Sequence, residues 1–213
     1  MRTVIKNITK MRKSVFITAL LMCVSASSFA QVSVEAGYVN SSHKMTVTGT
    51  STSGNTDGLY VGASWNFALG DVLGVAPGVY YEFLTTDSYK LPFATGSVQE
   101  HYMNIPVLLN AGVNFGDNVR AFVYAGPTLN YGIAASTSVD SGIGKRGNRK
   151  KQNLYSDSDY KRFDVLVGGG AGVELMHRVR FSVGYNAGLL NRTSAANSTL
   201  KRNQLHIGAA FVF

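Results

Sequence analysis

The sequence is poor in cysteine and in charged residues, and after residue 30 it has no long apolar run. Its only cysteine is Cys23, and charged residues make up 15% of the 213 residues. A disulfide-stabilised scaffold is therefore excluded, as is a helical membrane domain after residue 30, since a membrane helix needs about 18 consecutive apolar residues. Hydrophobic residues make up 45% of the chain, which excludes a disordered protein. The 23 glycines and 11 tyrosines argue against a helical bundle.

Residues 1–30 have the pattern of a cleavable signal peptide. A basic segment at residues 10–13 precedes an apolar run at 15–24, and the small residues Ser28 and Ala30 stand at positions −3 and −1 before Gln31. Ten apolar residues are too few to cross a bilayer as a helix. We therefore predict two parts, a signal peptide at 1–30 and one membrane domain at 31–213.

Three other interpretations of the N-terminal segment stay open. If Met11 is the true start, residues 1–10 are an upstream extension. A buried N-terminal helix is a second possibility, and a lipoprotein anchor at Cys23 is a third, although Met22 is large for the position before a lipidated cysteine. Removal of residues 1–30 would leave 15 basic and 12 acidic residues out of the 20 and 12 in the whole chain. The net charge of +8 thus belongs largely to the leader, and we expect no nucleic-acid partner.

After residue 30 the sequence alternates with a period of two, which is typical of β-strands. Eight segments place apolar residues at every second position, with small or polar residues between them. The apolar rows lie within residues 32–38, 59–67, 75–83, 103–109, 119–131, 163–175, 179–187 and 205–213. Segments of about this length can cross an outer membrane as barrel strands.

The composition of the polar rows distinguishes a membrane barrel from a soluble sandwich. These rows are rich in glycine and poor in lysine, as expected for a narrow lumen rather than a wet outer face. They also carry large aromatic residues that would fill the lumen of an eight-stranded barrel. The predicted lumen aromatics are Tyr60, Tyr80, Tyr102, Phe122 and Tyr124.

The connections between these segments alternate between long and short. Long connections are predicted at 41–57, 85–99, 133–160 and 191–203, and short ones at 69–72, 114–118 and 176–178. Outer-membrane barrels have long extracellular loops and short periplasmic turns. We therefore predict an all-β fold: an eight-stranded antiparallel transmembrane β-barrel in the bacterial outer membrane, with both termini in the periplasm.

Three stretches resemble a known family. Residues 102–109 (YMNIPVLL), 124–129 (YAGPTL) and 168–175 (GGGAGVEL) are similar to segments of the PorT-like "porin family" of outer-membrane β-barrels common in Bacteroidota. The resemblance implies the barrel fold and the cell envelope, and it leaves open a role as an accessory factor in protein secretion. Phe213 ends the last strand and resembles the terminal aromatic signal read by the barrel assembly machinery, which we expect as a partner.

A run of basic residues in the third long connection indicates a second partner. It consists of Lys145, Arg146, Arg149, Lys150 and Lys151. No aromatic residue is interleaved for base stacking, whereas the phosphates of lipopolysaccharide are available outside the membrane. Outer-membrane lipids and lipopolysaccharide are therefore the expected partners, and a solvated loop is the alternative. The protein is expected to be monomeric.

A search for catalytic residues finds none. The four histidines, His43, His101, His177 and His206, are scattered and have no recognisable spacing to a serine and an acid. No metal-ligand pattern occurs, and the glycines at 168–172 lack the Lys-Ser/Thr of a phosphate loop. We predict no catalytic, cofactor-binding or metal site, and a non-enzymatic protein with a structural, adhesive or assembly role. A lipid A-modifying enzyme is the alternative.

The lumen is also predicted to contain charge. Glu174 and Arg180 stand three residues either side of His177, so a tight hairpin would place them opposite each other. Glu35 and Arg120 are expected at a similar depth. Since an unpaired charge is costly in so narrow a space, we predict that Glu35, Arg120, Glu174 and Arg180 form one ion-pair cluster that plugs this end of the lumen.

Overall fold

The computed structural model describes residues 30–47, 50–91, 94–141, 148–153, 161–193 and 198–213. The described part of the chain is almost entirely β-structure. Its strands are β1 (Gln31–Val47), β2 (Thr50–Ala68), β3 (Leu73–Leu91), β4 (Ala94–Phe115), β5 (Val119–Ser141), β6 (Asn148–Asn153), β7 (Phe163–Leu175), β8 (Val179–Gly188) and β9 (Ser198–Val212). Nowhere in these ranges is there a helix long and apolar enough to cross a membrane.

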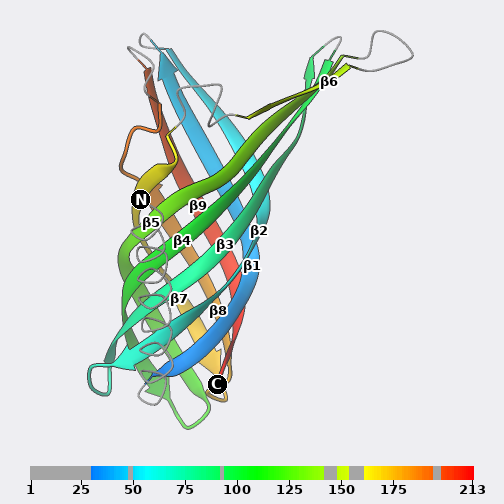
Figure 1. The fold of residues 1–213 in the computed structure, drawn as a ribbon. Coiled ribbons are helices and arrows are strands. Elements are labelled where there is room, and N and C mark those ends of the chain that lie inside the picture. The colour runs from blue at the N-terminus through cyan, green and yellow to red at the C-terminus, as the bar shows by residue number, and fades with distance from the viewer. Residues whose placement is uncertain (1–29, 48–49, 92–93, 142–147, 154–160, 194–197) are drawn as a thin grey trace, which may run out of the picture.

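Eight of these strands form a closed antiparallel barrel. Strands that follow one another along the chain pair with each other, except that β5 pairs with both β4 and β7 and so bypasses β6 in the wall. The pairing of β1 with β9 closes the barrel. The short strand β6 stays outside the wall and pairs with β5 at residues 136–141, beyond the part of β5 that pairs with β7. Figure 1 shows β6 at the tip of strands that lean away from the barrel. The predicted eight-stranded fold is confirmed.

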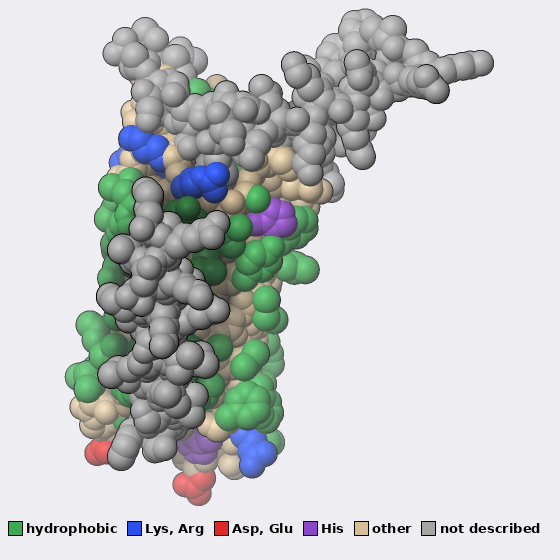
Figure 2. Space-filling model, in the orientation of Figure 1, with side chains coloured by type: hydrophobic (Ala, Val, Ile, Leu, Met, Phe, Trp, Pro, Cys, Tyr) green, Lys and Arg blue, Asp and Glu red, His purple; other side chains and the backbone are tan. Residues whose placement is uncertain are grey.

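The period of two in the sequence separates an apolar outer wall from a polar lumen. Outward-facing apolar side chains such as Leu59 and Leu109 are 66% and 64% exposed, whereas the inward-facing Tyr102 is fully buried. Figure 2 shows the hydrophobic side chains on the outer wall between the two ends. A wall of this kind is buried only when lipid surrounds it. The predicted lumen aromatics all lie on the inner face or line the lumen cavity.

Glycine in the inward rows makes room for these aromatic side chains. A Cβ atom on Gly208 would lie 2.0 Å from the hydroxyl oxygen of Tyr60, and one on Gly172 would lie 2.4 Å from Cζ of Phe122. Both distances are far below van der Waals contact, so the strands can carry the large rings only where the facing residues have no side chain. The high glycine content of the sequence is therefore a packing requirement of the narrow barrel.

The two ends of the barrel differ. Residues 69–72, 116–118 and 176–178 form tight turns at one end, called the turn end here, where Gln31 and Phe213 also lie. At the opposite loop end the strands extend beyond the apolar band. Most of the residues predicted as long connections are therefore strand: β1 reaches Val47, and β2 begins at Thr50. Outside the membrane no lipid requires an apolar face, so these extensions lack the alternation by which the sequence identifies strands.

Candidate functional site

The hairpin between β7 and β8 brings Glu174 and Arg180 together at the turn end of the lumen. Met176 and His177 both have positive φ, 53° and 54°, the sign pattern of the type I′ turns that suit tight hairpins. This turn fixes the register in which Glu174 opposes Arg180. Nη2 and Nε of Arg180 donate to Oε2 of Glu174 at 2.7 and 3.2 Å. The predicted ion pair is confirmed, with Glu174 only 2% exposed.

The other two members of the predicted cluster do not join this pair, so the four-residue cluster is wrong. Arg120 opposes Glu174 across β5 and β7, but it forms no ion pair with any residue in the described ranges. Its guanidinium group lies over Gly112, with Nε 2.6 Å from the position of an added Cβ. Glu35 is two strands from Arg180, because Ala210 on β9 stands between them in register. Arg180 therefore pairs with its immediate neighbour.

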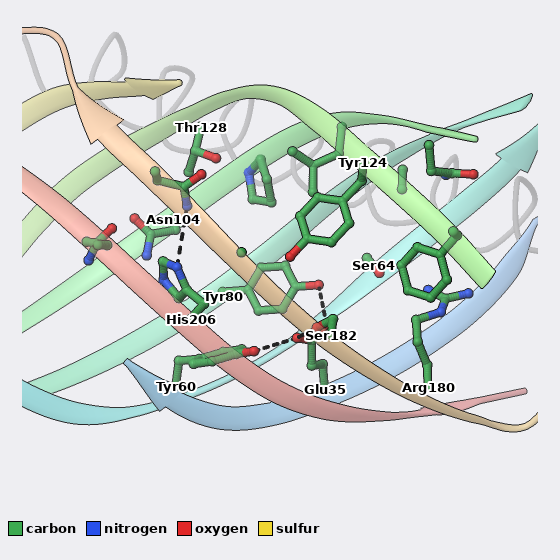
Figure 3. Close-up of a pocket in the computed structure, with 18 of the residues that line it drawn as sticks. Glu35, Tyr60, Ser64, Tyr80, Asn104, Tyr124, Thr128, Arg180, Ser182 and His206 are labelled. Atoms are coloured by element: carbon green, nitrogen blue, oxygen red, sulfur yellow. Dashed lines mark hydrogen bonds between the residues drawn. The ribbon is translucent and has the colours of Figure 1, made fainter. Parts of the chain in front are cut away.

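Hydroxyl groups stabilise Glu35 in place of a cation. Tyr60 and Ser182 donate hydrogen bonds to Oε1 of Glu35 at 2.5 and 3.2 Å, and Tyr80 donates to Oε2 at 3.4 Å. Figure 3 shows Glu35 facing these side chains at the wall of the cavity. The predicted lumen aromatics thus have a polar role as well as a packing role, since two of them hydrogen-bond to a carboxylate.

A cavity of about 120 Å³ occupies the middle of the lumen. Glu35, Tyr80 and Tyr124 line one part of it, and Glu82 and His206 line another. A volume of this size holds a few water molecules. Arg120 and Arg180 toward the turn end and Gln204 further toward the loop end also line the cavity, so polar side chains bound it on both sides.

Glu82 is the centre of a second buried network, on the loop-end side of the cavity. It is 1% exposed and accepts a hydrogen bond from Nε2 of Gln204 at 2.8 Å. Nε2 of His206 lies 3.0 Å from Oε1 of Glu82, and Nη2 of Arg202 lies 3.5 Å from Oε2. One carboxylate thus joins three residues of β9 to β3 across the lumen.

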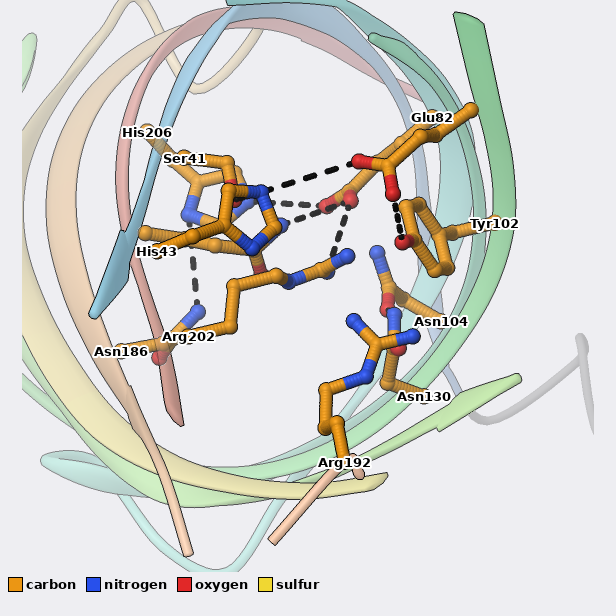
Figure 4. Close-up of polar contacts among 12 residues, drawn as sticks. Ser41, His43, Glu82, Tyr102, Asn104, Asn130, Asn186, Arg192, Arg202 and His206 are labelled. Atoms are coloured by element: carbon orange, nitrogen blue, oxygen red, sulfur yellow. Dashed lines mark hydrogen bonds and ion pairs between the residues drawn. The ribbon is translucent and has the colours of Figure 1, made fainter. Parts of the chain in front are cut away.

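Two fully buried arginines, Arg192 and Arg202, fill the loop end of the lumen around Tyr102. Their Cζ atoms lie 5.0 and 4.0 Å from the centre of the tyrosine ring, within the range of cation–π contacts. The hydroxyl of Tyr102 donates to Oε1 of Glu100 at 2.9 Å. Figure 4 shows these side chains converging inside the barrel. The loop end of the lumen is therefore occupied by side chains.

Sequence reasoning missed this loop-end network. Arg202 lies within residues 191–203, which the sequence predicts as a long connection, but β9 begins at Ser198 and carries Arg202 into the lumen. Arg192 precedes β9, and its backbone N–H donates to the carbonyl of Leu200 at 3.0 Å. Had the inward period of β9 been followed back from Gln204 to position 202, it would have placed Arg202 inside. No comparable signal identifies Arg192.

The structure also brings a serine, a histidine and an acid together, which the sequence did not indicate. Ser41 Oγ lies 3.4 Å from Nε2 of His43, and Glu100 Oε2 lies 3.6 Å from the same nitrogen. A catalytic relay needs the serine and the acid on different ring nitrogens, so that the acid orients the ring while the other nitrogen accepts the serine proton. Ser41 is also fully buried. The arrangement is suited to a structural contact and not to nucleophilic catalysis.

Three further predictions concern a metal site, the basic run and the leader. Within the described ranges no group of three or more His, Cys, Asp or Glu residues could hold a metal ion. The basic run at 145–151 lies outside the residues whose side chains the structure describes. Its proposed contact with lipopolysaccharide therefore stays a prediction. The leader at 1–30 likewise lies almost wholly outside the described residues and also stays a prediction.

Comparison with known proteins places the chain in a family. The model of the outer membrane protein beta-barrel domain matches residues 24–194. The chain belongs to this family. It is therefore an outer-membrane β-barrel protein, as the outward apolar wall requires. No curated protein matches the sequence.

Several solved structures have a similar fold. Ail, the attachment invasion locus protein of Yersinia pestis, has 12% identity and a TM-score of 0.49, over 86% of this chain and 99% of that one. Neisserial surface protein A has 15% identity and a TM-score of 0.44, over 85% and 97%. The outer membrane enzyme PagL has 14% identity and a TM-score of 0.43, over 84% and 98%. TM-scores below 0.5 are too low to carry a functional conclusion.

Proposed function

We propose that this protein is a non-enzymatic, non-conducting barrel that displays its loop-end strands at the cell surface for attachment. The observation that carries this proposal is the length of the strands. β4 has 22 residues and β5 has 23, about twice the 9–11 that a tilted strand needs to cross the membrane. The excess forms an ordered β-ribbon with β6 instead of a loose loop, and an ordered projecting surface is suited to binding.

The edge of this ribbon offers a binding mode. Within the described residues β6 pairs only with β5, so its other edge presents backbone N–H and C=O groups that no described strand uses. Such an edge can take up an extended peptide as an additional strand. Arg149, Lys150 and Lys151 belong to β6, and positive charge on an edge strand disfavours pairing with a second copy of itself. A monomer that binds an acidic extended segment is the outcome this arrangement favours.

The lumen supports the remaining parts of the proposal. Arg192, Arg202 and Tyr102 occupy its loop end, and the Glu174–Arg180 pair occupies its turn end. A pathway for solutes would have to displace both sets of side chains. The buried Ser41 and the shared nitrogen of His43 favour a protein without acyl-transfer activity.

A deletion strain complemented with variants tests this function. Pro cannot donate a backbone hydrogen bond, and successive N–H groups of an edge strand point alternately to the partner strand and outward. Lys150→Pro and Lys151→Pro are therefore a matched pair, in which one variant blocks the open edge and the other disturbs pairing with β5. We expect the deletion to reduce attachment to mucin-coated wells and to leave the lipid A mass spectrum unchanged, and the edge-blocking variant to behave like the deletion. Altered lipid A acylation in the deletion strain would instead indicate an enzyme.

We propose in addition that both termini are periplasmic, that the C-terminal strand engages the barrel assembly machinery, and that the loop end faces outward. Trypsin added to intact cells should then cleave at the basic residues of the loop-end ribbon and spare Arg178 at the turn end. A role as an accessory factor in secretion is the second candidate, and only the resemblance of residues 102–109 to the PorT-like family favours it. Loss of secreted proteins from the medium of the deletion strain, with attachment unchanged, would support that candidate.

A further inference from the structure

Three exposed lysines lie near one another on the outer wall at the loop end. Lys44 on β1 stands directly opposite Lys201 on β9, and both side chains face outward into solvent. Lys161 also faces outward, just before β7. Its backbone N–H donates to the carbonyl of Arg192, whose own N–H donates to Leu200, the residue before Lys201. The lysine row, defined as Lys44, Lys161 and Lys201, therefore runs across neighbouring segments of the wall.

The lysine row has no counter-charge within the described part of the protein. None of the ion pairs between described residues includes any of the three lysines. The carboxylate of Asp57, on the next strand, accepts hydrogen bonds from Tyr38 and Asn40 instead. Like charges directly opposite each other on paired strands are destabilising. An anion from outside the chain would relieve this repulsion between Lys44 and Lys201.

The position of the lysine row relative to the membrane indicates which anion this is. Below Lys201 on β9, the outward residues Leu205 and Ile207 belong to the apolar wall and are 37% and 50% exposed. Leu205 is four positions along the strand from Lys201, which at about 3.3 Å per residue and a tilt of about 40° is roughly 10 Å along the barrel axis. Figure 2 shows basic side chains on the wall above the hydrophobic band. This is the depth of the lipid headgroups, which begin at the edge of the hydrocarbon core.

We propose that the lysine row binds the phosphate groups of lipopolysaccharide in the outer leaflet. The proposal rests on the outward orientation of the loop end proposed above. It assigns the lipid contact to the ordered wall of the barrel and not to the basic run at 145–151. Lysine binds phosphate as a compact, strongly hydrated charge on a flexible stem, so three adjacent lysines suit a headgroup that carries more than one phosphate. The apolar residues below would contact the acyl chains of the same lipid.

Lipid binding to the purified, detergent-folded protein tests this directly. Native mass spectrometry would compare bis-phosphorylated lipid A with the same lipid A after removal of its phosphates. We expect the wild type to bind the phosphorylated form at least tenfold more tightly. Each lysine near an anionic headgroup contributes about fivefold, so the triple variant Lys44→Gln/Lys161→Gln/Lys201→Gln should lose this preference and still bind the dephosphorylated form as the wild type does.

Two matched variants separate the lysine row from charge in general. Arg178→Gln removes an exposed cation at the turn end, and Arg149→Gln/Lys150→Gln/Lys151→Gln removes three cations from β6. Both should retain the preference for the phosphorylated lipid. If the β6 variant loses the preference and the lysine-row variant keeps it, or if the wild type shows no preference, the proposal is wrong. The measurement needs no membrane orientation and no attachment assay, so its outcome is separate from that of the proposed function.

Discussion

Substitution of Arg180 in the Glu174–Arg180 pair tests directly whether ion pairing in the lumen stabilises the barrel. Glu174 is 2% exposed, and its carboxylate receives two hydrogen bonds from Arg180 at 2.7 and 3.2 Å. Arg180→Ala would leave this carboxylate buried beside the turn, where His177, 3.7 Å away, is its remaining ion-pair partner among the described residues. Breaking a buried pair typically costs 3–5 kcal/mol. Because the Arg180 side chain is 14% exposed and water can enter from the turn end, we expect a loss of about 3 kcal/mol in the free energy of unfolding.

A double-mutant cycle separates the ion pair from the other contacts of Arg180. The guanidinium group also lies 5.1 Å from the centre of the Phe122 ring, so a single substitution removes a cation–π contact as well. Glu174→Gln alone leaves Arg180 without its counter-charge, whereas Glu174→Gln with Arg180→Ala removes both charges. We expect the double variant to be at least as stable as Arg180→Ala alone, with a coupling energy of about 2 kcal/mol between the two sites.

Urea unfolding of the detergent-folded protein measures these differences. Trp65 is the only tryptophan, so its fluorescence reports on the barrel wall without interference from other sites. Arg120→Ala is the control, because Arg120 opposes Glu174 in register and yet forms no ion pair with a described residue. It should cost less than about 1 kcal/mol. If Arg180→Ala is no more destabilising than Arg120→Ala, or if the coupling energy is near zero, the ion pair contributes nothing and the reasoning fails.

Three further predictions concern assembly, conductance and packing. Deletion of Phe213, whose N–H donates to Val32 at 2.8 Å, should lower the outer-membrane yield and leave protein in the periplasm; an unchanged heat-modifiable barrel in cell fractions would contradict this. The pure protein should form no stable nanosiemens channel in planar bilayers, because side chains fill an eight-stranded lumen. Gly208→Ala should reduce stability by about 1–3 kcal/mol in the same urea assay, since its Cβ would lie 2.0 Å from the Tyr60 hydroxyl; wild-type stability would show that the ring moves freely.

The sequence predicts the barrel well where the membrane constrains it. Lipid on one side and a narrow lumen on the other require apolar and small residues to alternate, and this pattern located all eight barrel strands. Beyond the apolar band both faces contact water, so residues such as those from Thr50 to Asn55 in β2 show no alternation although they are strand. The same reason explains why β6 was not predicted. Its existence depends on pairing with β5 and not on any pattern of its own.

The charges in the lumen show a second limit of sequence reasoning. Glu174 and Arg180 could be paired from the sequence because one short hairpin fixes their register. Glu82 and Arg202 are 120 residues apart, and their contact exists only because the barrel closes through β1 and brings β9 opposite β3. In a closed barrel, an inward-facing charged side chain can contact polar groups from several strands. It pairs with the nearest of them, and Glu35 accordingly accepts hydrogen bonds from nearby hydroxyl groups and does not pair with Arg180. Polar contacts within one hairpin are thus predictable from sequence, whereas contacts across a lumen require the register of the whole barrel.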